Sequence, residues 1–264
     1  MKIRIGMRLA AVITVMNVLA ATDLSAQFQP AGSLGALAPA NLAKPRPKPP
    51  FDLTGTWLHG GGANNGFRFS PPEGFKLTPE AQKHYDAAQK AQAEGKVYRD
   101  DIGQCWPAGL PVIMTRVWPI AMIQLPTAIY MVSEFMNSFR VVYMDGRPHT
   151  DPDIAVPSFN GESIGRWEGD TLVIDTKYFV PDHHWIDSGI PGSDALHIVE
   201  RMKLTNQGQT LEIEYTLTDP KSWVGDWKMT KRWRRVDDRD IAEVSCLPDL
   251  NQHMPTTQSK DNVR

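Results

Sequence analysis

The amino-acid sequence predicts a mainly β fold in which an antiparallel meander closes into a β-barrel, with one surface helix and long loops. About eight short segments of strand-like composition follow one another, and turn residues such as Asp145 and Gly146 separate several of them. The composition, with 8 Trp and 21 Pro among 264 residues, favours a loop-rich β protein over a helical bundle. Closing such a meander removes its exposed edges and leaves an interior that can hold one small ligand. A β-sandwich remains the alternative.

Several of the expected strands are joined by short turns, which favours consecutive hairpins. The strands are expected over residues 51–58, 128–136, 139–144, 163–167, 171–176, 196–204, 210–218 and 226–236. One helix is expected over 77–94, where Thr78 can cap the first turn, Pro79 suits the first helical position and Gly95 follows the end. Its weak amphipathicity places it on the surface. Residues 100–126 are punctuated by proline and are expected to form an irregular belt.

The two ends of the chain differ in composition from its centre. Residues 1–26 are interpreted as a signal peptide, with Lys2, Arg4 and Arg8 ahead of an apolar run and cleavage after Ala26; an uncleaved anchor is the alternative. Residues 27–50 are expected to be a Pro-rich linker, 51–250 a single barrel domain and 251–264 a disordered tail. No later segment is long and apolar enough to cross a membrane, so we expect a periplasmic or secreted protein. The net charge of −2 gives no reason to expect a nucleic-acid partner.

The two cysteines fit this compartment. Cys105 and Cys246 lie far apart in sequence, and in an oxidising compartment such a pair is expected to form one disulfide. A divalent metal is a weaker expectation, because His149, His184, His197, Asp187 and Glu200 supply donors without any tight ligand spacing. A hydrolase is also less favoured, since Ser188 and Ser193 lie in no G-x-S-x-G elbow. We therefore expect no cofactor.

Four segments carry a family resemblance. MDGRPH (144–149), SIGRWEGDTLVIDT (163–176), HWID (184–187) and SDALHIVERMKL (193–204) resemble a large, mostly uncharacterised family of exported bacterial proteins. FDLTGTW near residue 51 and CWPAGLP near residue 105 look like that family too, so the likeness covers most of the mature chain. FDLTGTW is also similar to the start of lipocalin-like domains, which implies a calycin or lipocalin-like barrel. The resemblance implies no activity and no catalytic residues.

Side-chain alternation places two carboxylates on apolar strand faces. In segment 196–204, Glu200 shares a face with Ile198 and Met202, whereas His197 and Arg201 lie on the other face. A carboxylate among apolar side chains costs several kcal/mol unless it is paired or protonated. Glu200 is therefore either a structural ion-pair partner or a tuned acid/base. Glu134 poses the same question, and an arginine across the hairpin is its favoured partner.

Long loops contribute the other candidate site residues. Arg147 and His149 follow a strand end, where binding residues often collect. Segment 181–194 is a long connection that we expect to act as a lid. The expected catalytic residues are His197, Glu200, Asp187 and His149, with Tyr143 as a hydrogen-bond donor. The expected substrate-binding residues are Trp185, Arg147, Arg201, His184, Glu134 and Trp167.

These residues predict an exported, cofactor-independent lyase or isomerase. It would apply general acid/base catalysis inside a hydrophobic barrel to a small apolar or aromatic molecule. A periplasmic binding protein for a hydrophobic small molecule, without turnover, is the alternative, and an interaction module is a third possibility. An acid/base enzyme needs a convergent cluster of ionisable groups, for which Glu200, His197 and Asp187 are the first candidates, whereas a binding protein needs few buried ionisable groups.

Overall fold

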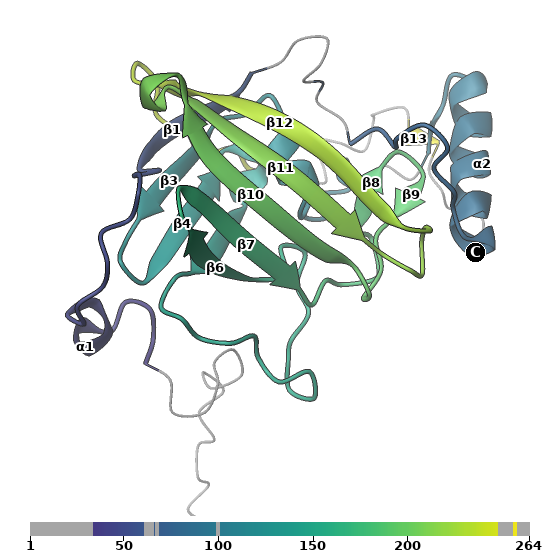
Figure 1. Cartoon of the computed structure of the whole chain (residues 1–264). Coiled ribbons are helices and arrows are strands. Elements are labelled where there is room, and N and C mark those ends of the chain that lie inside the picture. Colours follow the sequence, from purple (N-terminus) through teal and green to yellow (C-terminus); the bar gives the residue numbers. More distant parts are fainter. Residues whose placement is uncertain (1–33, 61–65, 67–68, 99–100, 248–255, 258–264) are drawn as a thin grey trace, which may run out of the picture.

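The computed structural model describes residues 34–60, 66, 69–98, 101–247 and 256–257. The expected signal peptide and most of the expected disordered tail lie outside these residues. Within them the chain forms a closed barrel with the strand order β1-β12-β11-β10-β7-β6-β5-β4-β3 (Figure 1). The barrel strands are β1 (Gly55–His59), β3 (Ile120–Gln124), β4 (Ala128–Ser133), β5 (Phe139–Tyr143), β6 (Glu162–Glu168), β7 (Thr171–Lys177), β10 (His197–Thr205), β11 (Thr210–Thr218) and β12 (Asp226–Val236). The predicted mainly β barrel is confirmed.

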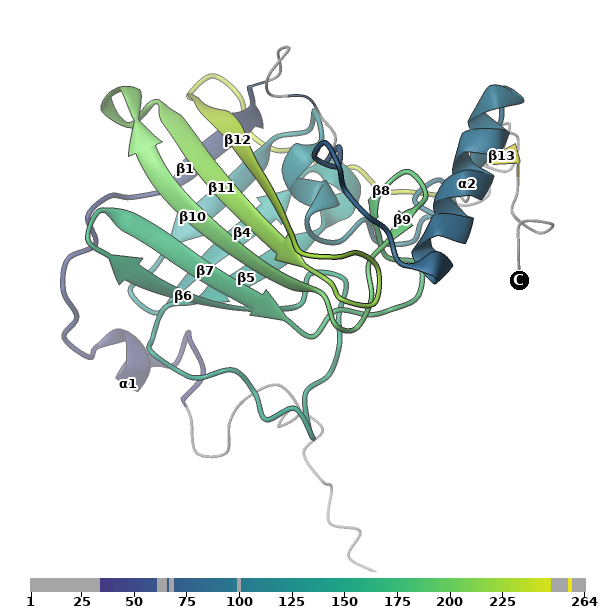
Figure 2. The same ribbon diagram turned by 45° about the vertical axis from the view of Figure 1, so that its right-hand side comes forward.

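Smaller elements lie outside the barrel. The surface helix is confirmed as α2 (Pro79–Ala93), whose first turn is capped by the Thr78 side chain accepting from the Ala81 amide. The two-stranded pairs β8 (Trp185–Asp187) with β9 (Ile190–Pro191) and β2 (Val97–Tyr98) with β13 (Thr256–Thr257) complete the sheets. Short helices are α1 (Pro39–Leu42), η2 (Val112–Thr115), η3 (Phe135–Asn137) and η4 (Asn206–Gly208). Figure 2 shows α2, β8 and β9 together at one end of the barrel.

The barrel departs from a simple meander at one place. All its strand pairs are antiparallel except β5 and β6, which run parallel and share the pairs Val142 with Ser163 and Tyr143 with Ile164. Consecutive parallel strands require a connection that returns to the starting end. Residues 144–161 make this return as a long loop outside the barrel (Figure 1). This loop positions the candidate site.

Three expected segments need correction. The segment expected to be an irregular belt contains β3, which closes the barrel by pairing with β1. The segment expected to be an extended linker contains α1, whose Asn41 is buried and donates a hydrogen bond to Asp145 at 2.9 Å. The strand expected over 128–136 ends at Ser133, because residues 134–138 turn with Met136 and Asn137 at positive φ. A proline-rich composition therefore did not exclude regular structure in either segment.

The barrel interior is filled by side chains. Trp57, Ile198, Met202, Leu217 and Trp227 point inward and have no solvent-accessible surface. A void large enough for a small ligand would expose part of the side chains that line it, so none adjoins these five residues. The expected hydrophobic pocket is therefore absent from this part of the barrel interior.

The disulfide between Cys105 and Cys246 is confirmed, with their Cα atoms 5.5 Å apart. It links the segment before η2 to the chain that follows β12. This second segment is also tied down by Glu134, which accepts from the guanidinium of Arg239 at 3.0 Å and from the Ala242 amide at 3.1 Å. Glu134 does have an arginine partner, but the arginine follows β12 and does not lie across the β4–β5 hairpin.

Candidate functional site

Four ionisable side chains form a continuous hydrogen-bonded row on the outer surface of the barrel. Asp175 binds two histidines, one with each carboxylate oxygen: His149 Nε2 lies 2.8 Å away and His197 Nε2 lies 2.9 Å away. The other ring nitrogen of His149, Nδ1, lies 2.9 Å from a carboxylate oxygen of Glu162. We refer to Glu162, His149, Asp175 and His197 as the histidine–carboxylate row.

Strand register explains three members of the row. Asp175 in β7 pairs with Ile164 of β6 on one side and with Val199 of β10 on the other. Residues two apart on a strand share a face, so Glu162 and His197 point outward with Asp175. Their neighbours Ser163 and Thr176 point inward and are fully buried.

The fourth member, His149, comes from the 144–161 loop. The next residue fixes the loop in place, because Thr150 donates to Glu162 through its amide at 2.9 Å and through its hydroxyl at 2.6 Å. The Tyr178 hydroxyl, just after β7, donates to the Thr150 carbonyl at 2.6 Å. The loop is thus bound at both β6 and the end of β7, and the His149 ring lies between Glu162 and Asp175.

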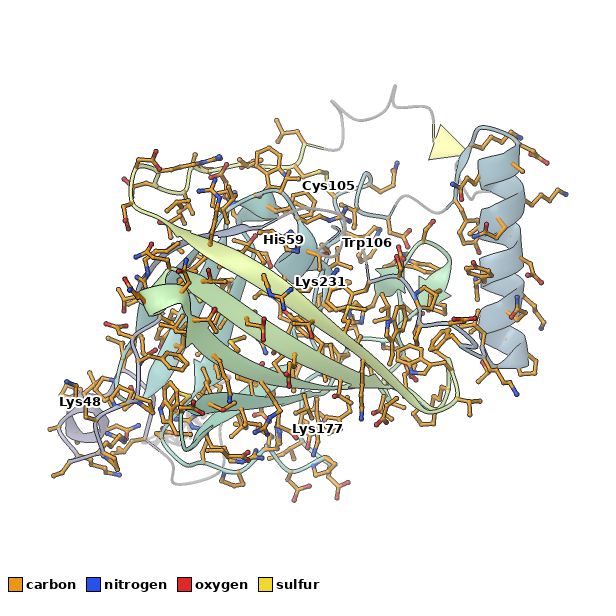
Figure 3. All side chains as sticks on the ribbon, turned by 45° about the horizontal axis from the view of Figure 1, so that its top comes forward. Lys48, His59, Cys105, Trp106, Lys177 and Lys231 are labelled. Atoms are coloured by element: carbon orange, nitrogen blue, oxygen red, sulfur yellow. A yellow bond between two sulfur atoms is a disulfide. The ribbon has the colours of Figure 1, made fainter. Side chains whose placement is uncertain are left out.

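Electrostatics fix the charges of His149, Asp175 and Glu162 at neutral pH. Burial lowers the pKa of His149, but the hydrogen bonds with Asp175 and Glu162 outweigh it and raise the pKa to about 9. Burial raises the pKa of Asp175, yet its bonds with His149 and His197 hold that pKa well below the usual range. The pKa of Glu162 is also lowered, because bonds from His149 and Thr150 outweigh its burial. Lys177, the last residue of β7 and labelled in Figure 3, adds a cation. Its Nζ lies 3.7 Å from an Asp175 carboxylate oxygen.

The two histidines therefore differ in what they can do. Both ring nitrogens of His149 are bound to carboxylates, so it is a protonated bridge with no nitrogen left for a ligand. His197 uses only Nε2, and its Nδ1 has no hydrogen-bond partner among the described residues. The His197 side chain is 36% exposed. The row thus ends in an oriented imidazole that can exchange a proton with a bound molecule.

A cleft of about 840 Å³ adjoins the row outside the barrel. It lies over the outward face of β5, with the 144–161 loop as its opposite side. Its apolar and aromatic lining includes Phe139, Val141, Tyr143, Ala155, Val156 and Phe159. Thr150, Glu162 and Tyr178 line the same cleft, and Cys105 and Cys246 contribute the disulfide to it. The cleft and the row therefore share Glu162.

The structure brings His149, His197 and Tyr143 to this region but separates Glu200 from them. Glu200 is fully buried inside the barrel, where both of its oxygens accept from the Arg140 guanidinium. Arg140 also donates to the hydroxyls of Ser163 and Thr176, each at 3.0 Å. Glu200 points inward and His197 outward, so these two candidate catalytic residues do not converge. From the sequence, Glu200 is either a structural ion-pair partner or a tuned acid/base, and the geometry agrees with the ion-pair partner.

The two arginines expected to bind substrate are both paired with carboxylates. Arg147 donates to the two oxygens of Asp145 at 2.8 and 2.6 Å, and its guanidinium lies 4.2 Å from the centre of the Tyr143 ring. Arg201 donates to Glu168 at 2.8 Å. Neither guanidinium is directed to the cleft as an anion-binding group. Arg147 instead supports Tyr143, which lines the cleft.

The expected lid residues lie elsewhere. Trp185 donates to Asp101 at 2.5 Å, and Asp187 accepts the Ser188 amide at 2.7 Å. Both belong to β8, which packs with β9 near α2 and does not fold over the row (Figure 2). His184 is 1% exposed, bonds to the Leu110 carbonyl at 2.5 Å, and its pKa is lowered by burial to about 4. Trp167 packs edge-on against Phe51 with ring centres 4.7 Å apart.

Sequence reasoning missed Asp175 and Glu162. Alternation within 171–176 places Asp175 opposite the face of Leu172 and Ile174, which marks it as an outward carboxylate. The register between β7 and β10 was not predictable, because about twenty residues separate the two strands and no short turn fixes their pairing. Glu162 lies one residue before the expected start of its strand, and strand ends are the least certain part of such predictions.

Within the described residues, no group of three or more His, Cys, Asp or Glu side chains has the arrangement of a metal site. No helix of that part of the chain combines the length and the apolar character needed to span a bilayer. The disulfide fits an oxidising compartment. No protein-family model matches this sequence, and no curated protein matches it.

Proposed function

We propose that this protein is an exported enzyme that moves a proton on a small apolar or aromatic molecule, as a lyase or an isomerase without a cofactor. The observation that carries the proposal is the pairing of Asp175 with two histidines, of which His197 keeps an open ring nitrogen. A carboxylate that orients an imidazole is the recurrent arrangement for general acid/base catalysis. The adjoining cleft supplies a place for the substrate.

His197 is the proposed proton-transfer group. With Nε2–H donated to Asp175, the neutral ring presents the Nδ1 lone pair as a base. His197 takes a proton from a carbon of the substrate and becomes an imidazolium, which the Asp175 carboxylate stabilises. In an isomerase it returns the proton to a different carbon. In a lyase it gives the proton to the departing oxygen, while a carbon–carbon double bond forms and water leaves.

Glu162 and His149 are positioning residues in this scheme. They hold Asp175 from the side opposite His197, and they connect the row to the cleft. Glu162 lies on β6 and His197 on β10, with β7 between them, so the two side chains are about 10 Å apart. A molecule of two fused rings spans that distance. The apolar body of the substrate would occupy the cleft, and its reacting carbon would reach His197.

Deuterium wash-in tests the proposal without a known substrate. The protein is incubated in D₂O with a bacterial small-molecule extract, and mass spectrometry records compounds that are consumed or gain deuterium. The wild type is compared with His197→Asn and Asp175→Asn. His183→Asn serves as the matched control, because His183 lies outside the row and has a similarly exposed side chain, 32% against 36% for His197.

We expect compounds that change with the wild type and with His183→Asn but with neither row variant. If no compound changes with the wild type relative to the row variants, the enzyme is ruled out. The second candidate is a binding protein for a hydrophobic small molecule, which the apolar lining of the cleft favours. It predicts a compound that co-purifies unchanged with the wild type and with both row variants.

A further inference from the structure

The cleft over β5 presents exposed apolar side chains to solvent. Phe139 is 67% exposed and Val156 is 42% exposed, and both line it. Phe159 lines it too, and Trp106, 41% exposed, lies near Phe159 with ring centres 6.4 Å apart. Contiguous exposed apolar surface of this kind often marks a binding site. The volume of about 840 Å³ falls within the usual range for small-molecule pockets.

The cleft is fixed in shape by contacts on both sides. The Asn160 side chain donates to the Phe139 carbonyl at 2.8 Å and to the Ser138 hydroxyl at 3.2 Å, which ties the loop to the start of β5. The Leu110 amide donates to the Phe159 carbonyl at 3.0 Å. The disulfide closes the cleft at another point. A ligand therefore meets a preformed surface and does not have to order it.

Charge is distributed unevenly around the cleft. Of the described residues that line it, only Arg140 and Glu162 carry a charge. The Arg140 side chain is 1% exposed and points into the barrel toward Glu200, so it offers nothing to a ligand. Glu162 stays ionised because its pKa is lowered. The described cations near the cleft are each paired with a carboxylate: Arg147 with Asp145, His149 with Glu162 and Asp175, and Lys177 with Asp175.

An anionic ligand would consequently lose its hydration in this cleft and gain no cation in exchange. A neutral hydroxyl group finds better partners. Burial raises the pKa of Tyr143, so its phenol remains a donor, and the hydroxyl has no hydrogen-bond partner among the described residues. Glu162 accepts three hydrogen bonds, from His149 and twice from Thr150, and a carboxylate has about four acceptor positions.

We infer that the cleft over β5 binds an uncharged apolar ring compound that carries a hydroxyl group, and that it rejects the corresponding carboxylate. The ring system would lie between the β5 side chains and the residues near Phe159. The hydroxyl would accept from Tyr143 or donate to Glu162. The inference rests on the proposed function only in taking this cleft as the substrate site, and the binding itself requires no turnover.

A matched pair of probes tests the inference. The full-length oxidised protein is titrated with 2-naphthol and with 2-naphthoate by calorimetry at pH 7.5, where the first is neutral and the second is an anion. Both have the same two fused rings. We expect 2-naphthol to bind at least about tenfold more tightly, because an anion beside Glu162 is repelled and unpaired. Equal binding, tighter binding of 2-naphthoate, or no binding of 2-naphthol would overturn the inference.

Variants locate the probe. Val141→Arg places a long cation on the outward face of β5, inside the cleft, and should weaken 2-naphthol binding at least tenfold while improving 2-naphthoate. Ile123→Arg is the matched control, since Ile123 lies on the outward face of β3, is 50% exposed and does not line the cleft. If Val141→Arg does not fold, Ala155→Arg on the opposite side of the cleft replaces it. Binding that neither cleft variant alters would place the probe elsewhere and refute the site.

The outcomes separate this inference from the proposed function. Selective 2-naphthol binding without any deuterium wash-in would support the inferred ligand site and refute the proposed enzyme. Deuterium wash-in that depends on His197 but occurs only in carboxylate compounds would support the proposed enzyme and overturn the inferred selectivity for neutral ligands.

Discussion

Replacing the buried ion pair inside the barrel should show that Glu200 holds the fold and does not take part in the chemistry. Arg140 and Glu200 have side chains that are 1% and 0% exposed. The Arg140 guanidinium makes two contacts with Glu200 and one each with Ser163 and Thr176. Glu200→Leu removes two of these contacts and leaves a guanidinium without a counter-ion, which costs about 3–5 kcal/mol. This is a large fraction of a typical free energy of unfolding, about 5–15 kcal/mol.

The double variant Arg140→Met with Glu200→Leu should recover most of that loss. It removes both charges of this ion pair, and Ser163 and Thr176 can still bond to each other, since their hydroxyls lie 2.9 Å apart. We expect its free energy of unfolding to lie within about 2 kcal/mol of that of the wild type. Each single variant should lose several kcal/mol, so a double-mutant cycle should give a coupling energy of about 3 kcal/mol or more.

Urea unfolding at pH 7, followed by tryptophan fluorescence, measures all four proteins. Additive single effects would refute the pairing, because two independent side chains show no coupling. The chemistry is tested on the same proteins: a folded double variant should keep 2-naphthol binding and deuterium wash-in. Loss of wash-in in a folded double variant would instead assign Glu200 a role in proton transfer.

Three further predictions concern stability and pH. Cys105→Ser with Cys246→Ser should lower the free energy of unfolding by up to about 5 kcal/mol, because the disulfide closes a loop with a sequence separation of 141; an unchanged urea midpoint would contradict this. The pKa of His149 is raised from 6.5 to about 9, so its protonated form should stabilise the fold by up to about 3 kcal/mol below pH 6.5. This stabilisation should be lost as the pH rises through 9, so the difference in free energy of unfolding between wild type and His149→Gln should shrink over this interval. A difference that stays constant with pH would refute the charged bridge. Glu134→Ala should free the segment near Arg239 and Ala242, seen as faster proteolysis after β12, whereas Glu243→Ala, a neighbouring exposed carboxylate, should not.

The sequence predicted the barrel because its signals are local. Alternation over 171–176 and 210–218, and turns such as Glu168–Asp170, depend only on neighbouring residues. The helix after Thr78 was also predictable from its cap and from Pro79. The strand at Ile120–Gln124 was not, because Pro119 and Pro126 flank it and suggested an irregular segment. Both prolines lie outside the strand, where they interrupt no ladder hydrogen bond.

The candidate site was only half predictable for a related reason. His149 and His197 are uncommon side chains in suggestive positions, and sequence reasoning selected both. Their common partner Asp175 depends on two pairings that no short turn determines, between β6 and β7 and between β7 and β10. For Glu200, alternation correctly predicted a side chain inside the barrel. Its partner Arg140 was not predictable, because the register of the strand that carries Arg140 depends on the turn at Met136 and Asn137.

The position of the site follows from the one parallel pair in the barrel. Had β5 and β6 formed a hairpin, a short turn would have joined them and the outer face of β5 would have faced solvent. Because they run parallel, the chain must return along the barrel before β6 begins, and residues 144–161 cover β5 on the way. That return creates the cleft and carries His149 over the edge of β6 to Asp175. The filled interior gives these outer residues a rigid support, so the barrel serves as a scaffold for a site on its outside. A variant that shortens this loop should therefore lose the cleft and the row together while the barrel still folds.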